Sequence, residues 1–503
     1  MEMKNSPTAV TKSKLSLAHR AASGAMWITL EMGCVQGISL LVFAVMAHFV
    51  EPKDFGLISI SYLSIFTFKS LIIDSVVFPV IRKEQAADID YTTAFWMTFA
   101  FALIASLAVF LSAGEAERLL HAPGLSKVMR AMSVILLFIG LARTHEMRLT
   151  RFFQFRILAF RAILGAVIGG VIGIVLAVFG YGVTALVVQQ IATSGISLAL
   201  LWTASSWRPD LRISMPVATE ILLFMRSMMP TSMISVVNQN CDTWMVAYFF
   251  GPASTGLYSV AKRLRVALQT VVGTPINSVG FSALAEVQSD AQRLKQVSRK
   301  IITLISFLCA PIFFGSSAIS WEIIQVAFGA KWAEAAPVFA LLSISGLFIV
   351  FQSFSDAVFT LKKCQIWSFY MLLLYTFIAI LLFFLSSALT LDNLALPFIL
   401  PYGIVFPLSA ALVSRLIGLS ISEWIASIAP PIISSGLMFV SVKLISQIMP
   451  ANQELLRLAV LSIAGVVIYG IAMLLVGRTT LNSMSDYLRD VIARRRSAAI
   501  SSP

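Results

Sequence analysis

The chain has 503 residues and a formal net charge of +13, and 58% of its residues are apolar whereas only 12% are charged. Soluble proteins have about a quarter of their residues charged, so a soluble globular protein is excluded. The basic residues lie mostly in loops that flank apolar runs, which is typical of membrane proteins and argues against nucleic acid as a partner.

Fourteen apolar segments follow one another along the chain, and each is long enough to cross a hydrocarbon core of about 30 Å as a helix. The first is too long for a signal-peptide core and is predicted to remain as a span. The seventh and eighth exceed the length that a bilayer requires, which predicts tilt, protrusion, or a kink at Pro230 or Pro275. The predicted fold is an all-α integral membrane protein with about fourteen transmembrane helices, at residues 23–50, 55–81, 92–113, 126–147, 157–179, 182–205, 217–249, 255–282, 301–321, 335–359, 366–388, 393–414, 422–446 and 457–477.

The basic residues of the loops alternate along the chain and test this count. One set of loops, together with both tails, contains 24 Lys and Arg residues, and the alternate set contains 5. Basic loops remain on the cytoplasmic side, and an even number of spans places both tails on one side. We therefore expect both termini to be cytoplasmic.

The sequence also contains an internal repeat with an offset of 200 residues. The segment Phe49–Ser59 resembles Phe249–Ser259 in its Phe, Pro, Gly, Leu and Ser positions. Six spans separate the copies, so they have the same orientation, as in a parallel repeat. The alternative is a chance recurrence of turn residues. The repeat predicts a basic N-terminal tail (1–22), an N-lobe of six helices (23–206), a pseudo-symmetric C-lobe of six helices (217–414), two further C-terminal helices (422–477) and a basic C-terminal tail (478–503).

No catalytic or metal-binding pattern is found in the sequence. The four histidines are scattered, there is no HExxH or P-loop motif, and the four cysteines stand singly without CxxC spacing. We therefore expect no catalytic residue, no metal site and no cofactor, and interpret the chain as a transporter rather than an enzyme. Its energy source is then an ion or substrate gradient, with proton or sodium coupling left open and an external ATPase as an alternative.

Ionisable residues inside spans are the candidate functional residues, because each costs about 2.5–3.5 kcal/mol at the bilayer centre and usually faces a partner or a wet cavity. Lys69 lies near the middle of the second span. Asp74 follows five residues later, about 140° around an α-helix, which predicts a poor direct pair. We expect Lys69 to face an aqueous cavity, with a structural ion pair to another helix as the alternative.

The eighth span carries a second polar group. Lys262, Arg265 and Gln269 have the i, i+3, i+7 spacing of one helix face, with Arg263 beside them, and Gln269 is the repeat equivalent of Lys69. These residues are predicted to line a cavity for an anionic substrate, and Arg226 of the seventh span extends this lining. For Lys262, Arg263 and Arg226 the alternative is snorkelling of the side chain to the membrane interface.

Acidic and amide residues inside spans are the candidate coupling or polar cavity residues. Glu31 and Asp242 are predicted to neutralise these cations or to carry a coupling proton. The alternative is a salt bridge or a hydrogen-bonded helix contact for Glu31, and pairing with a neighbouring cation for Asp242. Asn238 and Asn240 have side chains that bind either sugar hydroxyls or another helix. The Gly165, Gly169, Gly173 stripe is predicted to pack helices closely.

Short motifs along residues 10–360 resemble those of the Wzx-type polysaccharide and O-antigen flippases, within the multidrug/oligosaccharidyl-lipid/polysaccharide exporter superfamily. The resemblance implies two six-helix lobes around a central cavity, in the inner membrane of a bacterium. Residues beyond 390 match only in hydropathy. The motifs are Glu51-Pro-Lys-Asp-Phe-Gly-Leu57, Ala94-Phe-Trp96, Gly180-Tyr-Gly-Val183, Trp207-Arg-Pro209, Asn240-Cys-Asp242, Gly251-Pro252 and Gly256-Leu-Tyr-Ser-Val-Ala-Lys-Arg-Leu264.

The family resemblance also implies a substrate, namely an undecaprenyl-pyrophosphate-linked oligosaccharide moved by alternating access for exopolysaccharide, capsule or O-antigen synthesis. Membrane lipids, a polysaccharide polymerase and chain-length proteins are the other implied partners. Three alternatives remain. A lipid II flippase handles a similar substrate. A drug or cation exporter would have a cavity rich in acids and aromatics, and a polymerase or ligase would have a large extracytoplasmic loop.

Overall fold

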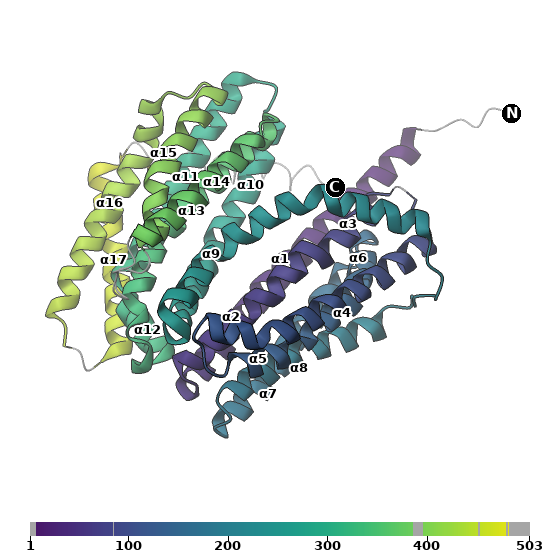
Figure 1. Cartoon of the computed structure of the whole chain (residues 1–503). Coiled ribbons are helices and arrows are strands. Elements are labelled where there is room, and N and C mark those ends of the chain that lie inside the picture. The colour runs from purple at the N-terminus through teal and green to yellow at the C-terminus, as the bar shows by residue number, and fades with distance from the viewer. Residues whose placement is uncertain (1–6, 84, 386–395, 451–452, 479–480, 482–503) are drawn as a thin grey trace. The chain divides into compact units, whose positions relative to one another are not determined.

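The computed structural model describes the chain except for residues 1–6, 84, 386–395, 451–452, 479–480 and 482–503 (Figure 1). Within the described ranges every regular element is a helix, and thirteen helices are long and apolar enough to cross a membrane. The longest of them, Met215–Glu286, has 72 residues and contains both the seventh and the eighth predicted spans. The all-helical membrane fold is therefore confirmed, whereas most of the C-terminal tail 478–503 lies outside the described residues.

The first helix, α1, begins earlier than predicted. It comprises Pro7–Phe49, so most of the predicted polar tail 1–22 is helical. The segment from residue 8 to 22 contains no glycine or second proline and is rich in Ala, Lys and Leu, which are good helix formers. The end of this polar stretch therefore marks where the apolar span begins, whereas the helix itself begins earlier.

The chain divides into two compact units, Met1–Ser259 and Val260–Pro503. The first unit contains α1 and the helices that follow it up to part of α9, which begins at Met215 and ends at Leu268. Helix α7 packs against α1 and α8, and α4 packs against α6 (Figure 1). The remaining elements of this unit are α2 (Pro52–Phe68), the π-helix η1 (Lys69–Ile73), α3 (Asp74–Arg82), α4 (Asp88–Leu119), α5 (Leu125–Met132), α6 (Val134–Arg151), α7 (Phe155–Val178) and α8 (Val183–Ala204).

This division differs from the predicted lobe boundary between residues 206 and 217. The first part of α9 packs into the first unit, where Ile221 and Met225 share a buried core with Val76. An ion pair of 2.8 Å between Lys83 Nζ and Glu220 Oε2 also joins α9 to the end of α3. The seventh span is thus held by the first unit through contacts that sequence similarity between the repeats does not reveal.

The predicted glycine stripe packs α7 against α8, as expected. A Cβ atom built on Gly169 would overlap the side chain of Thr193, and one built on Gly173 would lie 2.5 Å from Gln189 Cβ. A Cβ on Gly165 would lie 2.9 Å from the Thr193 carbonyl oxygen. The absence of side chains on α7 therefore allows the two backbones to approach closely.

Helix α9 is interrupted at Gly251, which has φ 75° and ψ −175° and lies between the predicted seventh and eighth spans, whereas Pro230 lies inside the helix. A positive φ is readily available to glycine, and Pro252 directly after it can begin a new helical segment. Pro275 lies at the start of α10 (Thr274–Glu286), just after the π-helix η2 (Gln269–Gly273). The break between the seventh and eighth spans is therefore a single glycine.

Two structural correspondences between the copies support the 200-residue repeat. The π-helices η1 and η2 begin at Lys69 and Gln269, at equivalent positions of the two copies. In addition, Gly56 and Gly256 make reciprocal contacts inside the first unit, because a Cβ on Gly56 would overlap the carbonyl oxygen of Pro252 and one on Gly256 would overlap that of Pro52. Chance recurrence of turn residues does not account for matching π-helices.

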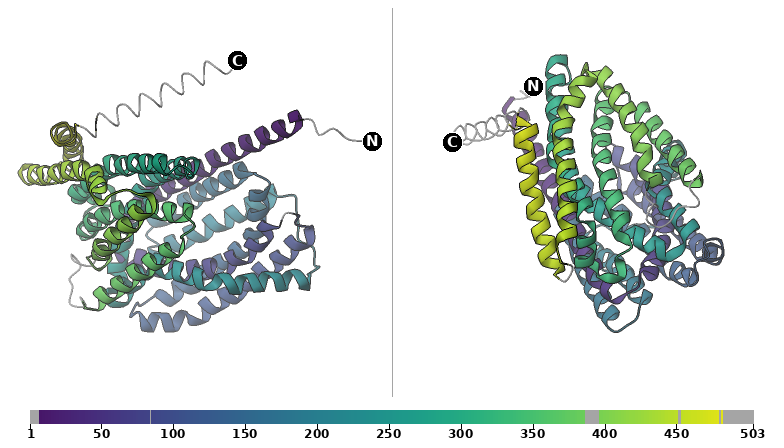
Figure 2. Two further views of the ribbon diagram at one scale, coloured as in Figure 1. Left: turned by 90° about the horizontal axis from the view of Figure 1, so that it is seen from above. Right: turned by 90° about the vertical axis from the view of Figure 1, so that its left-hand side faces the viewer.

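The second unit is built around α11, α13 and α16. Phe313, Phe351, Phe354 and Trp424 are buried in its core. Helix α16 packs against α11 and α17, and Figure 2 shows α17, in yellow, alongside its neighbours. The last two helices are thus packed onto the second unit. Its elements after α10 are α11 (Ala291–Ala318), α12 (Ser320–Phe328), the 3₁₀-helix η3 (Ala330–Trp332), α13 (Ala335–Leu361), α14 (Ile366–Leu385), α15 (Leu396–Ile417), α16 (Ile421–Ile448) and α17 (Glu454–Val476).

One buried ion pair attaches α17 to this unit. Arg457 Nε lies 2.8 Å from Glu322 Oε1 of α12, and the Glu322 side chain is only 3% exposed. The same guanidinium donates to the carbonyl oxygens of Ser446 and Met449 at the end of α16. Arg457 therefore joins α12, α16 and α17 at one point.

Glu322→Gln should lower the stability of the second unit, because it leaves the largely buried Arg457 without its counter-charge. Loss of one partner of a buried pair costs about 3–5 kcal/mol. The measurement is the Tm of the purified protein in detergent. Glu115→Gln is the control, since Glu115 and its partner Arg118 are 76% and 78% exposed, and its Tm should be unchanged. Equal Tm values for both variants would contradict a stabilising role of the Arg457 pair.

Candidate functional site

Lys69 and Asp74 form a direct ion pair, contrary to the prediction from α-helical geometry. Lys69 Nζ lies 2.7 Å from Asp74 Oδ2. The reason is the π-helix η1, in which the backbone N–H of Asp74 donates to the carbonyl oxygen of Lys69. This i→i+5 pattern brings residues five apart onto nearly the same side of the helix. The pairing therefore depends on a local change of helix type.

Asp74 continues into a network of alternating charges that reaches α6 and α7. Arg143 Nε lies 2.9 Å from Asp74 Oδ1, and Arg143 Nη1 lies 3.1 Å from Glu146 Oε2. Glu146 Oε1 in turn lies 2.7 Å from Arg161 Nη2. Three helices of the first unit are thus linked by charges inside candidate spans. We call the set Lys69, Asp74, Arg143, Glu146 and Arg161 the N-lobe charge network.

Glu31 of α1 lies at the far end of this network. Its half-buried carboxyl interacts electrostatically with Arg161 and Glu146. Arg161 also donates a hydrogen bond of 3.0 Å to the Ser197 hydroxyl on α8. The position of Glu31 is compatible with either of the predicted roles, because a carboxyl beside a shared cation can neutralise charge or exchange a proton.

The exposure of the cations decides which of them a ligand can reach. The Lys69 side chain is 36% exposed, whereas those of Arg143 and Arg161 are 24% and 13% exposed. Arg143 pairs with two carboxylates and Arg161 with Glu146 and the Ser197 hydroxyl, whereas Lys69 ends the chain of pairs. Lys69 is therefore the cation of the network that is best placed to meet an anionic ligand.

Three members of the network were missed by sequence reasoning. Arg143 and Glu146 lie in the predicted fourth span, and the test applied to Lys69, an ionisable residue inside an apolar segment, would have found both. Arg161 lies near the start of the predicted fifth span, close to the basic residues of the preceding loop. Arg143 and Glu146 have i, i+3 spacing and therefore lie on one face of α6, which was a further signal that they interact.

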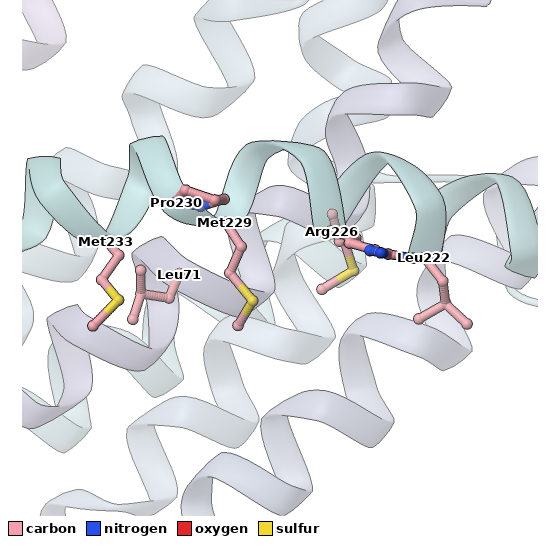
Figure 3. Close-up of a pocket in the computed structure, with 7 residues that line it drawn as sticks. Leu71, Leu222, Arg226, Met229, Pro230 and Met233 are labelled. Carbon is pink, nitrogen blue, oxygen red and sulfur yellow. The ribbon is translucent and has the colours of Figure 1, made fainter. Parts of the chain in front are cut away.

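Arg226 lies at an apolar hollow of about 570 Å³ on the first unit. Figure 3 shows Leu222, Met229 and Met233 projecting from α9, with Leu71 of η1 beside them. The hollow is thus lined by Leu and Met side chains and carries one guanidinium. Of the five predicted cavity cations, Arg226 is the one that lines this hollow.

The predicted polar face of the eighth span is present at Arg265 and Gln269. Arg265 Nη1 donates to Gln269 Oε1 at 3.3 Å, and Gln269 Nε2 donates to the carbonyl oxygen of Gly346 on α13 at 3.4 Å. Lys262 and Arg263, earlier on the same helix, are half-buried. Gln269 therefore bonds to an arginine and a backbone carbonyl, whereas its repeat equivalent Lys69 pairs with a carboxylate.

Asp242 makes hydrogen bonds across the Gly251 kink. Its Oδ2 accepts from the hydroxyl of Tyr258 at 2.8 Å, and its Oδ1 accepts from the backbone N–H and hydroxyl of Thr243. Asn240 donates to the carbonyl oxygen of Val236 within its own helix, and Asn238 is half-buried. Asp242 thus connects two of the family motifs, a structural role that was not among its predicted ones.

The described part of the chain contains no candidate metal site. No group of three or more His, Cys, Asp or Glu residues in those ranges is arranged to hold a metal ion. The four cysteines are free thiols, and Cys241 and Cys309 are buried.

The comparison with known families identifies the class of this membrane protein. The family described as "Polysaccharide biosynthesis protein" matches residues 45–337, which is more than half of the chain. The chain belongs to this family, and its predicted place among the polysaccharide flippases of the multidrug/oligosaccharidyl-lipid/polysaccharide exporter superfamily is confirmed. It is a transporter and not an enzyme.

Curated relatives share about a fifth to a quarter of their residues with the chain. The lipopolysaccharide biosynthesis protein WzxC of Escherichia coli (strain K12) is 22% identical over 335 residues, covering 66% of this chain and 68% of WzxC. The succinoglycan biosynthesis transport protein ExoT of Rhizobium meliloti (strain 1021) is 25% identical over 321 residues, 63% of this chain and 65% of ExoT. The teichuronic acid biosynthesis protein TuaB of Bacillus subtilis (strain 168) is 20% identical over 465 residues, 90% of this chain and 95% of TuaB.

Solved structures show the same fold. The lipid II flippase MurJ in an inward closed conformation has a TM-score of 0.70 at 14% identity, covering 92% of this chain and 100% of MurJ. An inward-facing multidrug resistance MATE family transporter has a TM-score of 0.57 at 13% identity, covering 76% of this chain and 96% of that chain. At such identities the likeness concerns the fold alone.

Proposed function

We propose that this protein is a flippase that moves an undecaprenyl-pyrophosphate-linked oligosaccharide from the cytoplasmic to the periplasmic leaflet of a bacterial inner membrane. The observation that carries the proposal is the N-lobe charge network, which holds a 36% exposed Lys69 inside a candidate span. A cation inside a span is costly to insert, so such residues usually mark the path of a substrate or ion. The names of WzxC, ExoT and TuaB, which refer to lipopolysaccharide, succinoglycan and teichuronic acid, support a polysaccharide precursor as the cargo.

The chemistry of the substrate matches the residues of the first unit. A pyrophosphate needs cations, and Lys69 and Arg226 supply them from different elements of the first unit. The polyprenyl chain needs an apolar surface, and the Leu- and Met-lined hollow beside Arg226 offers one. Methionine adapts its shape easily, which suits a long and flexible hydrocarbon. In the eighth span, we assign the same role, that of cations for the pyrophosphate, to Lys262, Arg263 and Arg265.

Transport by alternating access needs an energy source and a defined orientation. We assign coupling to a proton or sodium gradient, with Glu31 as the candidate coupling carboxyl because it adjoins Arg161 and Glu146. The basic loops support a cytoplasmic location for both termini. The transported lipid then reaches the periplasmic leaflet, where a polymerase and its chain-length proteins are the expected partners.

A lipid II flippase is the second candidate, because lipid II also presents a pyrophosphate and sugars to Lys69 and Arg226. The two functions predict different cellular phenotypes. Deletion of the gene in its native host should abolish the surface polysaccharide and cause the sugar-linked lipid to accumulate in the inner membrane while growth continues. Arrested growth with loss of cell-wall peptidoglycan would instead identify lipid II as the cargo. Unchanged surface polysaccharide in a growing deletion strain would overturn the proposal.

Lys69→Ala should reduce export to below about a tenth of the wild-type level, since a charge-assisted contact to the phosphate contributes about 1.5–3 kcal/mol. Protein abundance should be unchanged, because Asp74 still has Arg143 at 2.9 Å. Surface polysaccharide and abundance are measured together in the native host, and Lys69→Arg should retain most activity. Normal polysaccharide at normal abundance would remove Lys69 from the substrate path.

A further inference from the structure

The second unit contains an open hollow, with several polar side chains in its lining, that neither the charge network nor the sequence motifs explain. It has a volume of about 580 Å³ and lies between α10 and α13. Four of its eight side chains are hydroxyls, and the other four are an amide, a carboxyl, an aromatic ring and a methyl group. We call it the C-lobe cradle, and its lining consists of Thr274, Asn277, Ser278, Phe281, Ser353, Asp356, Ala357 and Thr360.

The cradle lies inside two candidate membrane spans, Met215–Glu286 and Ala335–Leu361. Ser278, Ser353 and Thr360 are exposed there. The polar side chains of the lining form a strip along α10 and α13, and an ionisable residue such as Asp356 inside a span usually faces water or a polar partner. Under the topology predicted from the basic loops, the strip lies in the cytoplasmic half of both spans, where a cytoplasmic cargo first enters.

The hydroxyls of the cradle present acceptor lone pairs. Ser278 donates its proton to the Thr274 carbonyl oxygen at 2.9 Å, Ser353 to that of Ile349 at 3.0 Å, and Thr360 to that of Asp356 at 2.8 Å. Each hydroxyl oxygen therefore keeps its lone pairs for a ligand. A ligand with several O–H donors fits this surface.

Asp356 adds a carboxylate to these acceptors. Its Oδ1 accepts from Gln352 Nε2 at 3.2 Å, and Ser368 also hydrogen-bonds to it. Asp356 belongs to none of the ion pairs within 4.0 Å that the described residues make. The cradle has no basic side chain in its lining. A phosphate is therefore disfavoured here, in contrast to the first unit.

The extent of the cradle favours a polyhydroxylated molecule over a bare cation as its ligand. Its lining extends from residue 274 to 281 on α10 and from 353 to 360 on α13, and seven residues of helix span about 10 Å. A single ion needs only the space of about one water molecule, roughly 30 Å³, whereas volumes of about 300–1,000 Å³ are usual for small-molecule sites. Phe281 also offers an apolar face for the C–H side of a sugar ring.

We propose that the C-lobe cradle binds the sugar residues of the lipid-linked oligosaccharide through their hydroxyl groups, with Asp356, Asn277 and Ser278 as the specificity-determining residues. This inference rests on the proposed function and assigns the two chemical parts of the cargo to two separate sites. The first unit provides cations for the pyrophosphate, and the cradle provides acceptors for the carbohydrate.

Binding to the purified full-length protein in nanodiscs tests this assignment with two lipids. The first is the sugar-linked lipid extracted from a host strain that lacks the transporter, and the second is undecaprenyl pyrophosphate without sugar. Asp356→Asn keeps the side-chain volume and should weaken binding of the sugar-linked lipid about 10-fold or more, as expected for loss of a charged acceptor. It should leave binding of the sugar-free lipid unchanged. Ser278→Ala should show a smaller loss with the same selectivity.

Ser462→Ala is the matched control, because Ser462 is an exposed hydroxyl that donates to its own helix, here the Leu458 carbonyl oxygen of α17, and lies outside the cradle. Equal loss for both lipids, or none for either, would overturn the carbohydrate site. Wild-type binding of the sugar-linked lipid that depends on sodium, and loses this dependence in Asp356→Asn, would identify a cation site instead. Failure of the wild type to bind either lipid would contradict the proposed function itself.

Discussion

Glu146→Ala is expected to destabilise the first unit strongly and to remove export together with protein abundance. Glu146 lies between two arginines, with Arg143 Nη1 at 3.1 Å and Arg161 Nη2 at 2.7 Å. Removal of its carboxylate leaves Arg161, only 13% exposed, with Ser197 as its closest remaining hydrogen-bond partner. Loss of one partner of a buried pair costs about 3–5 kcal/mol, and both arginines are affected here.

The measurement for Glu146→Ala is the Tm of purified protein together with its abundance in membranes. Asp88→Asn is the control, because Asp88 pairs with Arg148 but is 79% exposed, and its Tm and abundance should match the wild type. Lys69→Ala, at the other end of the network, should also keep the wild-type abundance. A Glu146→Ala variant with normal Tm would show that the network does not hold α6 and α7 together.

Gly56→Ala and Gly256→Ala are expected to cause the second large effect, by preventing the close crossing of α2 and α9. The added Cβ atoms would overlap the backbone carbonyl oxygens of Pro252 and Pro52. A backbone oxygen cannot rotate away as a flexible side chain can, so the helices must separate, at a cost of about 3 kcal/mol or more. The reciprocal geometry predicts losses of similar size for the two variants.

The control for this crossing uses the same substitution where space is available. Gly33 on α1 and Gly436 on α16 have no atom within 4 Å of an added Cβ. Since Ala is a better helix former than Gly by about 1 kcal/mol, Gly33→Ala and Gly436→Ala should leave Tm unchanged or raise it. The same response at Gly56 and Gly256 would contradict the close backbone contact.

The membrane fold could be predicted from sequence because apolar length and loop charge report directly on a bilayer. The 200-residue repeat was also visible, since Pro52, Gly56, Pro252 and Gly256 stand at equivalent positions. These four residues were identified as a turn motif, but their mutual contact was not, because hydropathy contains no information about which helices cross.

The candidate site was predicted only in part. Lys69 was identified from its depth in an apolar span, yet its pairing with Asp74 depends on a π-helix that a 3.6-residue period does not reveal. Arg143 and Glu146 could have been found by the rule that identified Lys69. The attachment of α9 to the first unit could not have been predicted from the sequence, because it follows from the tertiary packing of Ile221 and Met225. Asp356 was likewise not considered, although it lies in a predicted span.

Translocation in reconstituted proteoliposomes tests the flippase assignment most directly. The sugar-linked lipid from the native host is placed in vesicles, and its accessibility to a membrane-impermeant glycosidase is followed over time under an imposed proton or sodium gradient. Wild-type protein should expose sugars of the inner leaflet to the enzyme faster than protein-free vesicles do, and Lys69→Ala should lose most of this rate. Equal accessibility in protein-containing and protein-free vesicles would contradict the assignment.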